Sequence, residues 1–250
     1  MSGKHLTSGM SISATVAGEG SDFPPLEKDT LRLYGTRFCP CTQRVLLTLE
    51  LKEIEYEVVY MNTRNKPSWY IEKSPTGLVP VLEINDQIVC ESIICCEYLD
   101  EVYSDSQLAA ETPYQRARDK MLINFFLSEM VPVIHKHSHP ADGLDEKQKE
   151  MFFDNMEKVL TKRKSPYFRG DTPGLLDIVL WPSFERIEGM DVLDGDSHGL
   201  PADRFPLLTS WMDAMVDVPA VQKFFLSAEQ HREFYKNYLR TKPLFDELLS

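Results

Sequence analysis

The chain passes from a mixed pattern of strands and helices to a purely helical pattern near residue 104, and this order limits the folds open to it. Alternating apolar residues predict strands at Leu31–Tyr34, Tyr56–Met61, Val79–Ile84 and Gln87–Cys90. Helical spacing follows the first strand, from Gln43 to Lys52, and the last strand, from about Ser92. This order predicts an α+β fold in which helices pack on a small mixed sheet.

Only helical patterns follow the polar segment 104–107. They predict helices at Pro113–His137, Glu146–Thr161, Leu175–Met190, Phe205–Val216 and Ala228–Leu239. We therefore expect two domains, residues 29–104 and residues 108–250, the second of them all-helical. Residues 1–28 are rich in Ser, Gly and Pro, and we expect them to form a flexible N-terminal extension that becomes anchored near Phe23–Pro25.

The composition limits the classes of partner. The formal net charge of −12 argues against a nucleic-acid partner, because such binding needs a basic face. No apolar run is long enough to cross a bilayer and the N-terminus has no apolar leader, so we expect a cytoplasmic protein without stable membrane insertion. Five cysteines, an odd number, do not suggest a secreted disulfide framework, and we expect reduced thiols.

The cysteines and histidines do not have the spacing of a metal site. Zinc ligands usually come as cysteine pairs two residues apart, whereas Cys39 and Cys41 are separated by a single residue and Cys95 and Cys96 are adjacent. The alternating histidines of residues 135–139 are followed by a proline, which favours a solvated helix end. We expect no metal cofactor.

The segment from Phe38 to Arg44 joins the first predicted strand to the first helical pattern. Cys39 is expected in the first turn of that helix, where unpaired backbone N–H groups and the helix macrodipole favour a thiolate. Pro40 suits this place because its fixed φ and missing N–H cost little at a helix start. Cys39 is thus a candidate nucleophile, and the alternative is a small, half-buried residue without chemistry.

Two further pairs of residues lie at predicted strand ends. A helix-start cysteine together with a later strand-start proline is typical of a thioredoxin-like domain. A cis Pro80 would turn the N–H and C=O of Val79 toward an extended peptide ligand, whereas the alternative is an ordinary strand-start proline. Ser92 is expected to cap the next helix and to receive a carboxylate. Glu91 either receives an ammonium group or only favours the positive helix end.

Taken together, these features make the chain resemble the omega class of cytosolic glutathione transferases, over nearly its whole length. The motifs that carry the resemblance are Arg37–Pro40, Asn65–Tyr70, Pro75–Glu83, Glu91–Ser92, Glu97–Glu101, Asp177–Pro182 and Phe184–Arg186. The resemblance implies a thioredoxin-like domain followed by an all-helical bundle domain.

The resemblance also implies a reaction. Cys39 would be the catalytic residue, whose thiolate forms a mixed disulfide with the co-substrate glutathione and reduces a small oxidised or electrophilic substrate by thiol exchange. The implied activities are dehydroascorbate reduction, thiol transfer and methylarsonate reduction, with weak glutathione conjugation, in detoxification and the stress response. A homodimer is implied as well.

By the same resemblance, separate residues hold the parts of glutathione. Lys66 would bind the glycyl carboxylate and the backbone of Val79 the cysteinyl unit. Glu91 and Ser92 would bind the γ-glutamyl end, and Pro80 would be the cis proline. A zwitterionic, acidic tripeptide accounts physically for this combination of cation, backbone edge, carboxylate and hydroxyl.

The second substrate would lie near residues of the helical domain. The residues implied for this site are Arg186, His231, Tyr235 and Tyr238. Each of them is equally compatible with ordinary packing, and for His231 we favour packing.

Two positions depart from the family pattern. Cys41 stands where an aromatic residue is commoner, and we expect it to tune or protect Cys39 more than to resolve a disulfide, since a disulfide between residues so close is strained. Gly174 stands where a capping Ser or Thr is usual, three residues before Asp177. Half of a capping box is therefore missing, and stability is the property placed in doubt.

Two other functions compete with this interpretation. One is a non-enzymatic, redox-sensing or ligand-binding relative, similar to the intracellular chloride channel proteins. The combined presence of Lys66, Val79, Glu91 and Ser92 argues against it, because such a relative has no need of all four. The other is a glutaredoxin-like disulfide reductase, which would usually have a cysteine where Thr42 stands.

Overall fold

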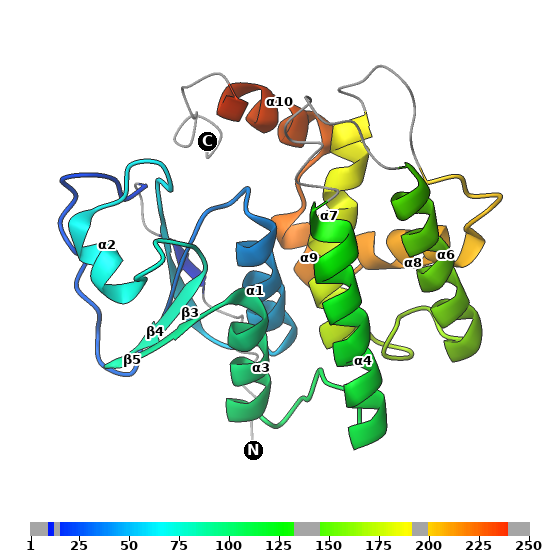
Figure 1. The fold of residues 1–250 in the computed structure, drawn as a ribbon. Helices are drawn as coiled ribbons and strands as arrows, with labels where there is room; N and C mark the ends of the chain where they lie inside the picture. Colours follow the sequence, from blue (N-terminus) through cyan, green and yellow to red (C-terminus); the bar gives the residue numbers. More distant parts are fainter. Residues whose placement is uncertain (1–9, 13–15, 133–145, 192–199, 240–250) are drawn as a thin grey trace. The chain divides into compact units, whose positions relative to one another are not determined.

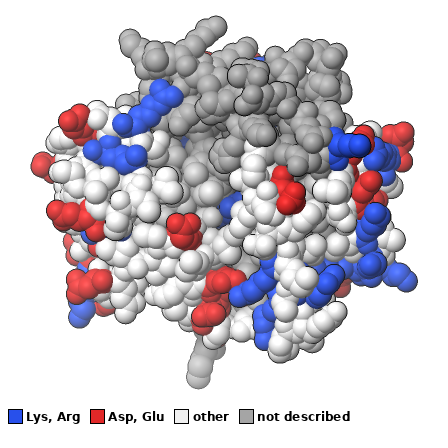
Figure 2. All heavy atoms as spheres, viewed as in Figure 1, with Lys and Arg blue, Asp and Glu red and all other residues white. Residues whose placement is uncertain are grey.

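The computed structural model describes residues 10–12, 16–132, 146–191 and 200–239 (Figure 1). The chain divides into two compact units, and the division falls between Ser106 and Gln107. Acidic and basic side chains are interspersed with neutral ones on the face drawn in Figure 2. In the described ranges, no helix combines the length and the apolar character needed to cross a membrane.

The first unit contains a mixed five-stranded sheet with the strand order β1-β3-β2-β4-β5. The strands are β1 (Met10–Ile12), β2 (Leu31–Gly35), β3 (Tyr56–Tyr60), β4 (Val81–Ile84) and β5 (Gln87–Cys90). Strands β1 and β2 both pair in parallel with β3, while β4 pairs antiparallel with β2 and with β5. Strand β5 therefore runs in the same direction as β2.

Three helices accompany this sheet. They are α1 (Pro40–Leu51), α2 (Ser68–Lys73) and α3 (Ser92–Val102). Helices α1 and α3 lie against each other on one side of the sheet, and α2 lies on the other side (Figure 1). A buried ion pair of 2.8 Å between Lys52 Nζ and Asp100 Oδ1 joins α1 to α3 near their C-terminal ends. The predicted α+β class with a thioredoxin-like first domain is confirmed.

Two short elements of this unit were not predicted. Strand β1 lies inside residues 1–28, where only a flexible extension was expected, and Ala17 extends the pairing by donating its N–H to Tyr60 O at 2.8 Å. Helix α2 lies between the strands predicted at Tyr56–Met61 and Val79–Ile84, where no helix was predicted. Both elements are too short to show a hydrophobic period, so contacts with other parts of the chain decide their structure.

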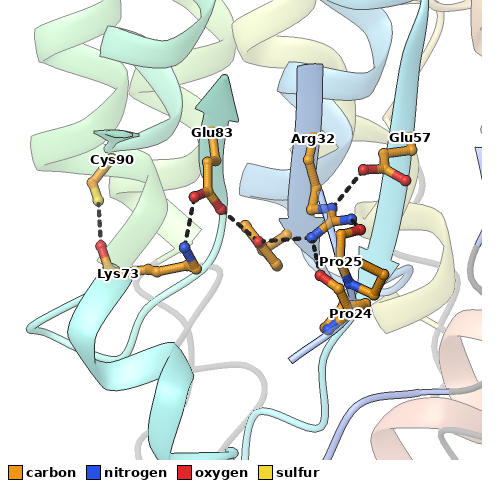
Figure 3. Close-up of polar contacts among 8 residues, drawn as sticks. Pro24, Pro25, Arg32, Glu57, Lys73, Glu83 and Cys90 are labelled. Atoms are coloured by element: carbon orange, nitrogen blue, oxygen red, sulfur yellow. Dashed lines mark hydrogen bonds and ion pairs between the residues drawn. The ribbon is translucent and has the colours of Figure 1, made fainter. Parts of the chain in front are cut away.

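A buried arginine anchors the segment before β2 to the sheet (Figure 3). The side chain of Arg32 is 1% exposed, and its Nε donates to Glu57 Oε1 on β3 at 2.7 Å. Its two terminal nitrogens donate to the carbonyl oxygens of Pro24 and Pro25. These bonds satisfy a buried guanidinium and fix the chain where we expected the N-terminal segment to become anchored.

A second polar group in Figure 3 joins α2 to the sheet. The two carboxylate oxygens of Glu83 on β4 accept hydrogen bonds of 2.6 Å, one from Tyr34 Oη and the other from Lys73 Nζ. Helix α2 is thereby held beside β4, although its own sequence is too short to make a stable helix alone.

In its described ranges, the second unit contains helices joined by loops and no strand. Its helices are α4 (Pro113–Phe125), the π-helical turn η1 (Phe126–Met130), α6 (Glu146–Arg163), α7 (Leu175–Asp191), α8 (Pro206–Val216), α9 (Pro219–Phe224) and α10 (Ala228–Leu239). The all-helical prediction is confirmed, and only the short α9 was not expected. The rest of the helix predicted at Pro113–His137, from residue 133 onward, lies outside the described residues.

A buried carboxylate organises the start of α7. Each oxygen of Asp177 accepts two hydrogen bonds, Oδ1 from Phe168 N and Trp211 Nε1 at 2.8 Å each, and Oδ2 from Arg169 N at 3.2 Å and Gly174 N at 2.9 Å. The bond to Gly174 is the acidic half of the capping box. The same carboxylate therefore caps α7 and fixes the loop before it to α8.

The glycine at the start of α7 has a packing reason. A Cβ built on Gly174 would lie 2.4 Å from Arg169 Cδ and 2.7 Å from the backbone oxygen of Leu108. That oxygen also accepts a hydrogen bond from Leu175 N at 2.9 Å, so it is not free to move away. A serine in this place would not fit, which explains why half of the capping box is missing.

We expect Gly174→Ala to lower the free energy of unfolding by about 1–3 kcal/mol, since backbone atoms crowd the added methyl group. Urea unfolding followed by circular dichroism measures the change. The matched control is Gly18→Ala, where the nearest atom to the new Cβ is Asn65 O at 3.4 Å, an ordinary contact. Equal stability of Gly174→Ala and Gly18→Ala would contradict the packing argument.

Candidate functional site

Three of the predicted site segments lie at one edge of the sheet: Cys39, Val79–Pro80 and Glu91–Ser92. Strands β2 and β5 run in the same direction, and α1 and α3 each begin at the carboxyl end of the preceding strand. Strand β4 begins at this edge too, because Val81 pairs with both Tyr34 and Cys90. Ligands of α/β sheets commonly bind at such an edge, where strands end and helices begin.

Cys39 occupies the N-cap of α1 and directly precedes its first residue, Pro40. Its backbone is extended, with φ −85° and ψ 122°, and its side chain is half-buried. Its N–H donates to Thr36 O at 3.1 Å, and its carbonyl oxygen accepts from Gln43 N at 3.0 Å. The sulfur therefore projects from a well-anchored helix start.

A glycine lets α1 approach β2 closely at this point. A Cβ on Gly35 would lie 2.3 Å from Thr42 Cγ2, so any larger residue would displace the first turn of α1. Thr42 Oγ1 in turn accepts a hydrogen bond of 3.2 Å from Thr36 N. Together these contacts fix the loop that carries Cys39.

The pKa of the Cys39 thiol is raised, whereas the sequence predicted that it would be lowered. A side-chain hydrogen bond with Cys41, burial, and the charge of a Cys41 thiolate raise the pKa of the Cys39 thiol, in that order, while the N–H and hydroxyl of Thr42 lower it. The expected lowering of this pKa by the helix start alone is wrong, because the neighbouring sulfur has the larger effect. The Cys39 thiolate therefore forms more readily when Cys41 is protonated.

Arg44 is a site residue that the sequence analysis missed. It is 3% exposed, and its Nη1 donates to Ser92 Oγ at 3.2 Å and lies 3.7 Å from Cys41 Sγ. The sequence does contain a feature that points to Arg44. It is a cation in a predicted helix, directly before the mostly apolar run from Val45 to Leu49. Such a charge becomes buried only where polar partners receive it.

The start of α3 differs in one detail from the expectation. Glu91, and not Ser92, is the N-cap, and its carbonyl oxygen accepts from Cys95 N at 2.8 Å. Ser92 is the first residue of the helix, where its hydroxyl accepts from Arg44. Glu91 is exposed and has a φ of 69°, a strained value for a residue other than glycine. Functional sites often hold such residues.

The peptide bond between Val79 and Pro80 is cis. Two hydroxyl groups hold Leu78, the residue before Val79. Its carbonyl oxygen accepts hydrogen bonds from Tyr70 Oη at 2.7 Å and from Ser74 Oγ at 2.9 Å. The half-buried Val79 is thereby held beside the first residue of β4.

Lys66 lies close to the same loop. Its Cδ and Cε atoms are 3.5 Å from the position that a Cβ on Gly77 would take, so its stem crosses over this glycine. Gly77 has a φ of 68° and closes a turn by donating its N–H to Ser74 O at 2.7 Å. A larger residue at Gly77 would strain the turn and crowd the lysine stem.

The residues implied for a second-substrate site belong to helices of the second unit. Arg186 and His231 are buried inside the helical unit, where His231 Nε2 lies 3.0 Å from Glu185 Oε1 and Arg186 Nη1 donates to Pro182 O. These contacts are compatible with packing, which we favoured for His231, and a role in the second-substrate site stays a prediction. Tyr235 and Tyr238 belong to α10, but their side chains lie outside the described part of the chain.

Metal ligation has no visible site in the described ranges. Among the residues described there, no three side chains of His, Cys, Asp or Glu lie close enough together to hold a metal ion. The histidines of residues 135–139 lie outside those ranges.

Comparison with known families gives matches to both units. The family model described as glutathione S-transferase, N-terminal domain matches residues 38–102, and the model of the C-terminal domain matches residues 127–228. Among solved structures, glutathione transferase omega 3C of Trametes versicolor has a TM-score of 0.72 at 26% identity, over 90% of this chain and 94% of that one. A tau-class enzyme of mango has a TM-score of 0.76 at 25% identity, over 84% and 99%.

Curated relatives are similar over nearly their whole length. Glutathione S-transferase omega-1 of Sus scrofa is 38% identical over 92% of this chain and 95% of its own, and omega-2 of Homo sapiens is 36% identical over 94% and 97%. The pyrimidodiazepine synthase of Drosophila melanogaster is 36% identical over 92% and 96%. The chain belongs to the glutathione S-transferase family and, within it, to the omega class.

The buried histidine gives a prediction about stability and pH. Burial lowers the pKa of His231 below its ordinary value of 6.5, despite the nearby Glu185, and the charge of Arg186 lowers it further. The unfolded chain therefore binds a proton at this residue more readily than the folded chain does. The free energy of unfolding is highest above the ordinary pKa and falls as the pH drops toward the lower, folded value.

We expect the free energy of unfolding of His231→Gln to fall less at low pH than that of the parent. The difference is about 1.4 kcal/mol for each unit by which the pKa of His231 differs between the folded and unfolded states. Glutamine keeps an N–H donor for Glu185 but does not titrate. Urea unfolding above and below about pH 6 measures the effect in both proteins. The same pH dependence in parent and variant would show that His231 is not responsible.

Proposed function

We propose that this glutathione transferase acts mainly as a thiol transferase and reductase, with Cys39 as its nucleophile. The observation that carries the proposal is the meeting of three features at one sheet edge: the N-cap thiol of Cys39, the cis peptide bond before Pro80, and the first residue of α3, Ser92. A thiol, a backbone edge and a helix start are the groups needed to hold and exchange a peptide thiol.

The proposed glutathione site uses a different contact for each part of the tripeptide. The ammonium of Lys66 receives the glycyl carboxylate, and the backbone of Val79 pairs with the cysteinyl unit. The start of α3, with the Ser92 hydroxyl, receives the γ-glutamyl carboxylate, and the exposed Glu91 receives its ammonium. The placement of Lys66 over the turn before Val79 supports this assignment.

The proposed reaction is thiol exchange at Cys39. The Cys39 thiolate attacks an oxidised or electrophilic substrate, or the sulfur of a glutathione mixed disulfide, and forms a covalent adduct. A glutathione thiolate then attacks the adduct, and the products are the reduced substrate and oxidised glutathione. The activities proposed are dehydroascorbate reduction, thiol transfer and methylarsonate reduction, with weak conjugation by comparison.

The cellular location and the oligomeric state of the protein are part of the same proposal. We place the activity in the cytoplasm and expect a homodimer, as in the superfamily. The similarity to omega-class relatives and to the pyrimidodiazepine synthase is nearly equal, so overall identity does not select the second substrate.

The first test is glutathione-dependent dehydroascorbate reduction at neutral pH. We expect Cys39→Ala to lose activity by roughly a hundredfold or more, because the proposed nucleophile is absent. The matched control is Cys90→Ala, which removes another half-buried thiol of the same unit. If the parent and both variants are inactive, the redox-sensing, non-enzymatic alternative is favoured. Full activity in Cys39→Ala would move the nucleophile elsewhere.

The second test concerns the glycyl carboxylate. We expect Lys66→Met to weaken glutathione binding roughly tenfold, because the variant loses a charge pair with the ligand. Calorimetry should also show that the parent discriminates against glutathione esterified at glycine and that Lys66→Met does not. Lys28→Met, which removes an exposed lysine, is the control. Equal discrimination by all three proteins would exclude Lys66 from this role.

A further inference from the structure

A cavity of about 390 Å³ lies in the second unit, between the end of α6, the first half of α8 and the loop that follows α6. Helices α6 and α8 pack against each other (Figure 1), and packed helices rarely leave a void larger than a water molecule. The small side chains of Ser165, Pro166 and Ser210 are part of the cavity wall. Ligand sites usually measure about 300–1,000 Å³, so this volume suits a molecule of one or two rings.

The floor of the cavity is the ring of Trp211. This residue is 1% exposed, and its ring packs edge to face against Phe168 and Phe184, with centroid distances of 5.3 and 5.0 Å. Its Nε1 donates to Asp177, so the surface that it contributes to the cavity is apolar. Leu207 also lines the cavity and is 41% exposed. The cavity thus has a rigid aromatic floor and an apolar rim.

Hydrogen bonds hold the walls of the cavity in place. The two carboxylate oxygens of Glu157 on α6 accept from Leu207 N at 3.0 Å and from Leu208 N at 2.8 Å, which joins α6 to the start of α8. On the other side, Tyr167 Oη donates to Ala214 O at 3.1 Å and ties the loop after α6 to α8. The cavity is therefore preformed, and a ligand would not have to order it.

The polar part of the wall favours a negatively charged ligand. Lys164 lines the cavity, and the described lining residues include no acidic side chain. The hydroxyls of Thr161 and Ser165 donate to backbone oxygens of their own segments, at 2.8 and 2.9 Å. Among the residues that the structure describes, the side chains of Lys164 and Ser210 have no hydrogen bond or ion pair. A cation and a hydroxyl are thus available to a ligand.

The backbone of Lys164 has a conformation that favours glycine. Its φ is 56°, and its N–H donates to Leu160 O at 2.9 Å directly after the last turn of α6. Glycine or asparagine is usual at this position, because a side chain strains the left-handed backbone. Lys162 and Arg163 already supply cations to the last turn of the helix. The helix end therefore gives little reason for a lysine here, whereas an anion in the cavity would.

We propose that this cavity binds a small aromatic carboxylate. The ring system lies on Trp211, between Leu160 and Leu207. The carboxylate lies at the rim, where it pairs with the ammonium of Lys164 and accepts a hydrogen bond from the Ser210 hydroxyl. All of these residues belong to the second unit, so the site is additional to the proposed glutathione site and does not depend on it.

The first experiment uses the full chain labelled with 5-fluorotryptophan, and 2-naphthoate as the probe. Phenylalanine substitutions of Trp69 and Trp181 assign the fluorine resonances of the three tryptophans, Trp211 by elimination. We expect 2-naphthoate to shift the Trp211 resonance most, with a dissociation constant of about 0.1–1 mM that saturating glutathione does not change. Binding that leaves the Trp211 resonance unmoved, or no binding at all, would overturn the proposal.

The second experiment tests the charge of the ligand. We expect Lys164→Gln to bind 2-naphthoate roughly two- to fivefold more weakly than the parent, since an exposed ion pair is lost, and to bind neutral 2-naphthamide equally well. The matched control is Lys162→Gln, which removes an exposed cation of the same helix end and should bind both probes as the parent does. Equal affinity of the parent for the two probes would rule out a carboxylate ligand.

The variant Lys164→Gly tests whether the lysine has a purely structural role. We expect it to bind 2-naphthoate as weakly as Lys164→Gln does, but to have a higher melting temperature than the parent, because glycine adopts this φ without strain. A lower melting temperature together with unchanged binding would show that Lys164 stabilises the helix end and does not contact the ligand.

The third experiment fills the cavity. Ser210 is exposed on α8, so a larger side chain there can enter the cavity without disturbing the interior of the unit. We expect Ser210→Phe to bind 2-naphthoate roughly tenfold more weakly or worse, because its ring occupies the place of the ligand. Ser210→Ala is the matched control and should lose no more than about threefold, the effect of one exposed hydrogen bond. Parent-like binding by Ser210→Phe would show that the probe binds elsewhere.

Discussion

The side chain of Arg44 connects the two helix starts on which the candidate site depends. It begins on α1 and donates to the hydroxyl of Ser92, the first residue of α3, and the same nitrogen reaches Cys41 Sγ. Near the other ends of these helices, Lys52 and Asp100 form a buried ion pair. These two polar links help to fix the relative position of α1 and α3, because a buried charge needs polar partners that this arrangement supplies.

The strand directions in the sheet determine where α1 and α3 begin. Since β2 and β5 run in one direction and β4 runs in the other, the carboxyl ends of β2 and β5 and the start of β4 meet at one edge. The thiol of Cys39, the cis bond before Pro80 and the first turn of α3 are therefore neighbours, although they are far apart in the sequence. Hydrogen bonds among Arg32, Tyr34 and Glu83 join β2 to β4.

The longer elements and their order could be predicted, because each carries a hydrophobic period of its own. The helix predicted at Glu146–Thr161 occurs as Glu146–Arg163, and the one at Ala228–Leu239 has the predicted bounds. Strand β1 and the helices α2 and α9 could not be predicted, since elements of three to six residues depend on partners elsewhere in the chain. The packing reason for a glycine at position 174 could not be predicted either. The backbone of Leu108 lies where a side chain at this position would be, and Leu108 is remote in sequence.

The sequence by itself determined which residues are available for chemistry: the helix-start Cys39, the Val79–Pro80 pair, and Glu91 with Ser92. The motifs around them also indicated the family, because each combines a residue type with a local backbone position. Only the tertiary structure decided that Arg44 is buried and meets Ser92, 48 positions away. Burial and charge–charge contacts depend on residues brought together by the sheet, and a local pattern does not contain them.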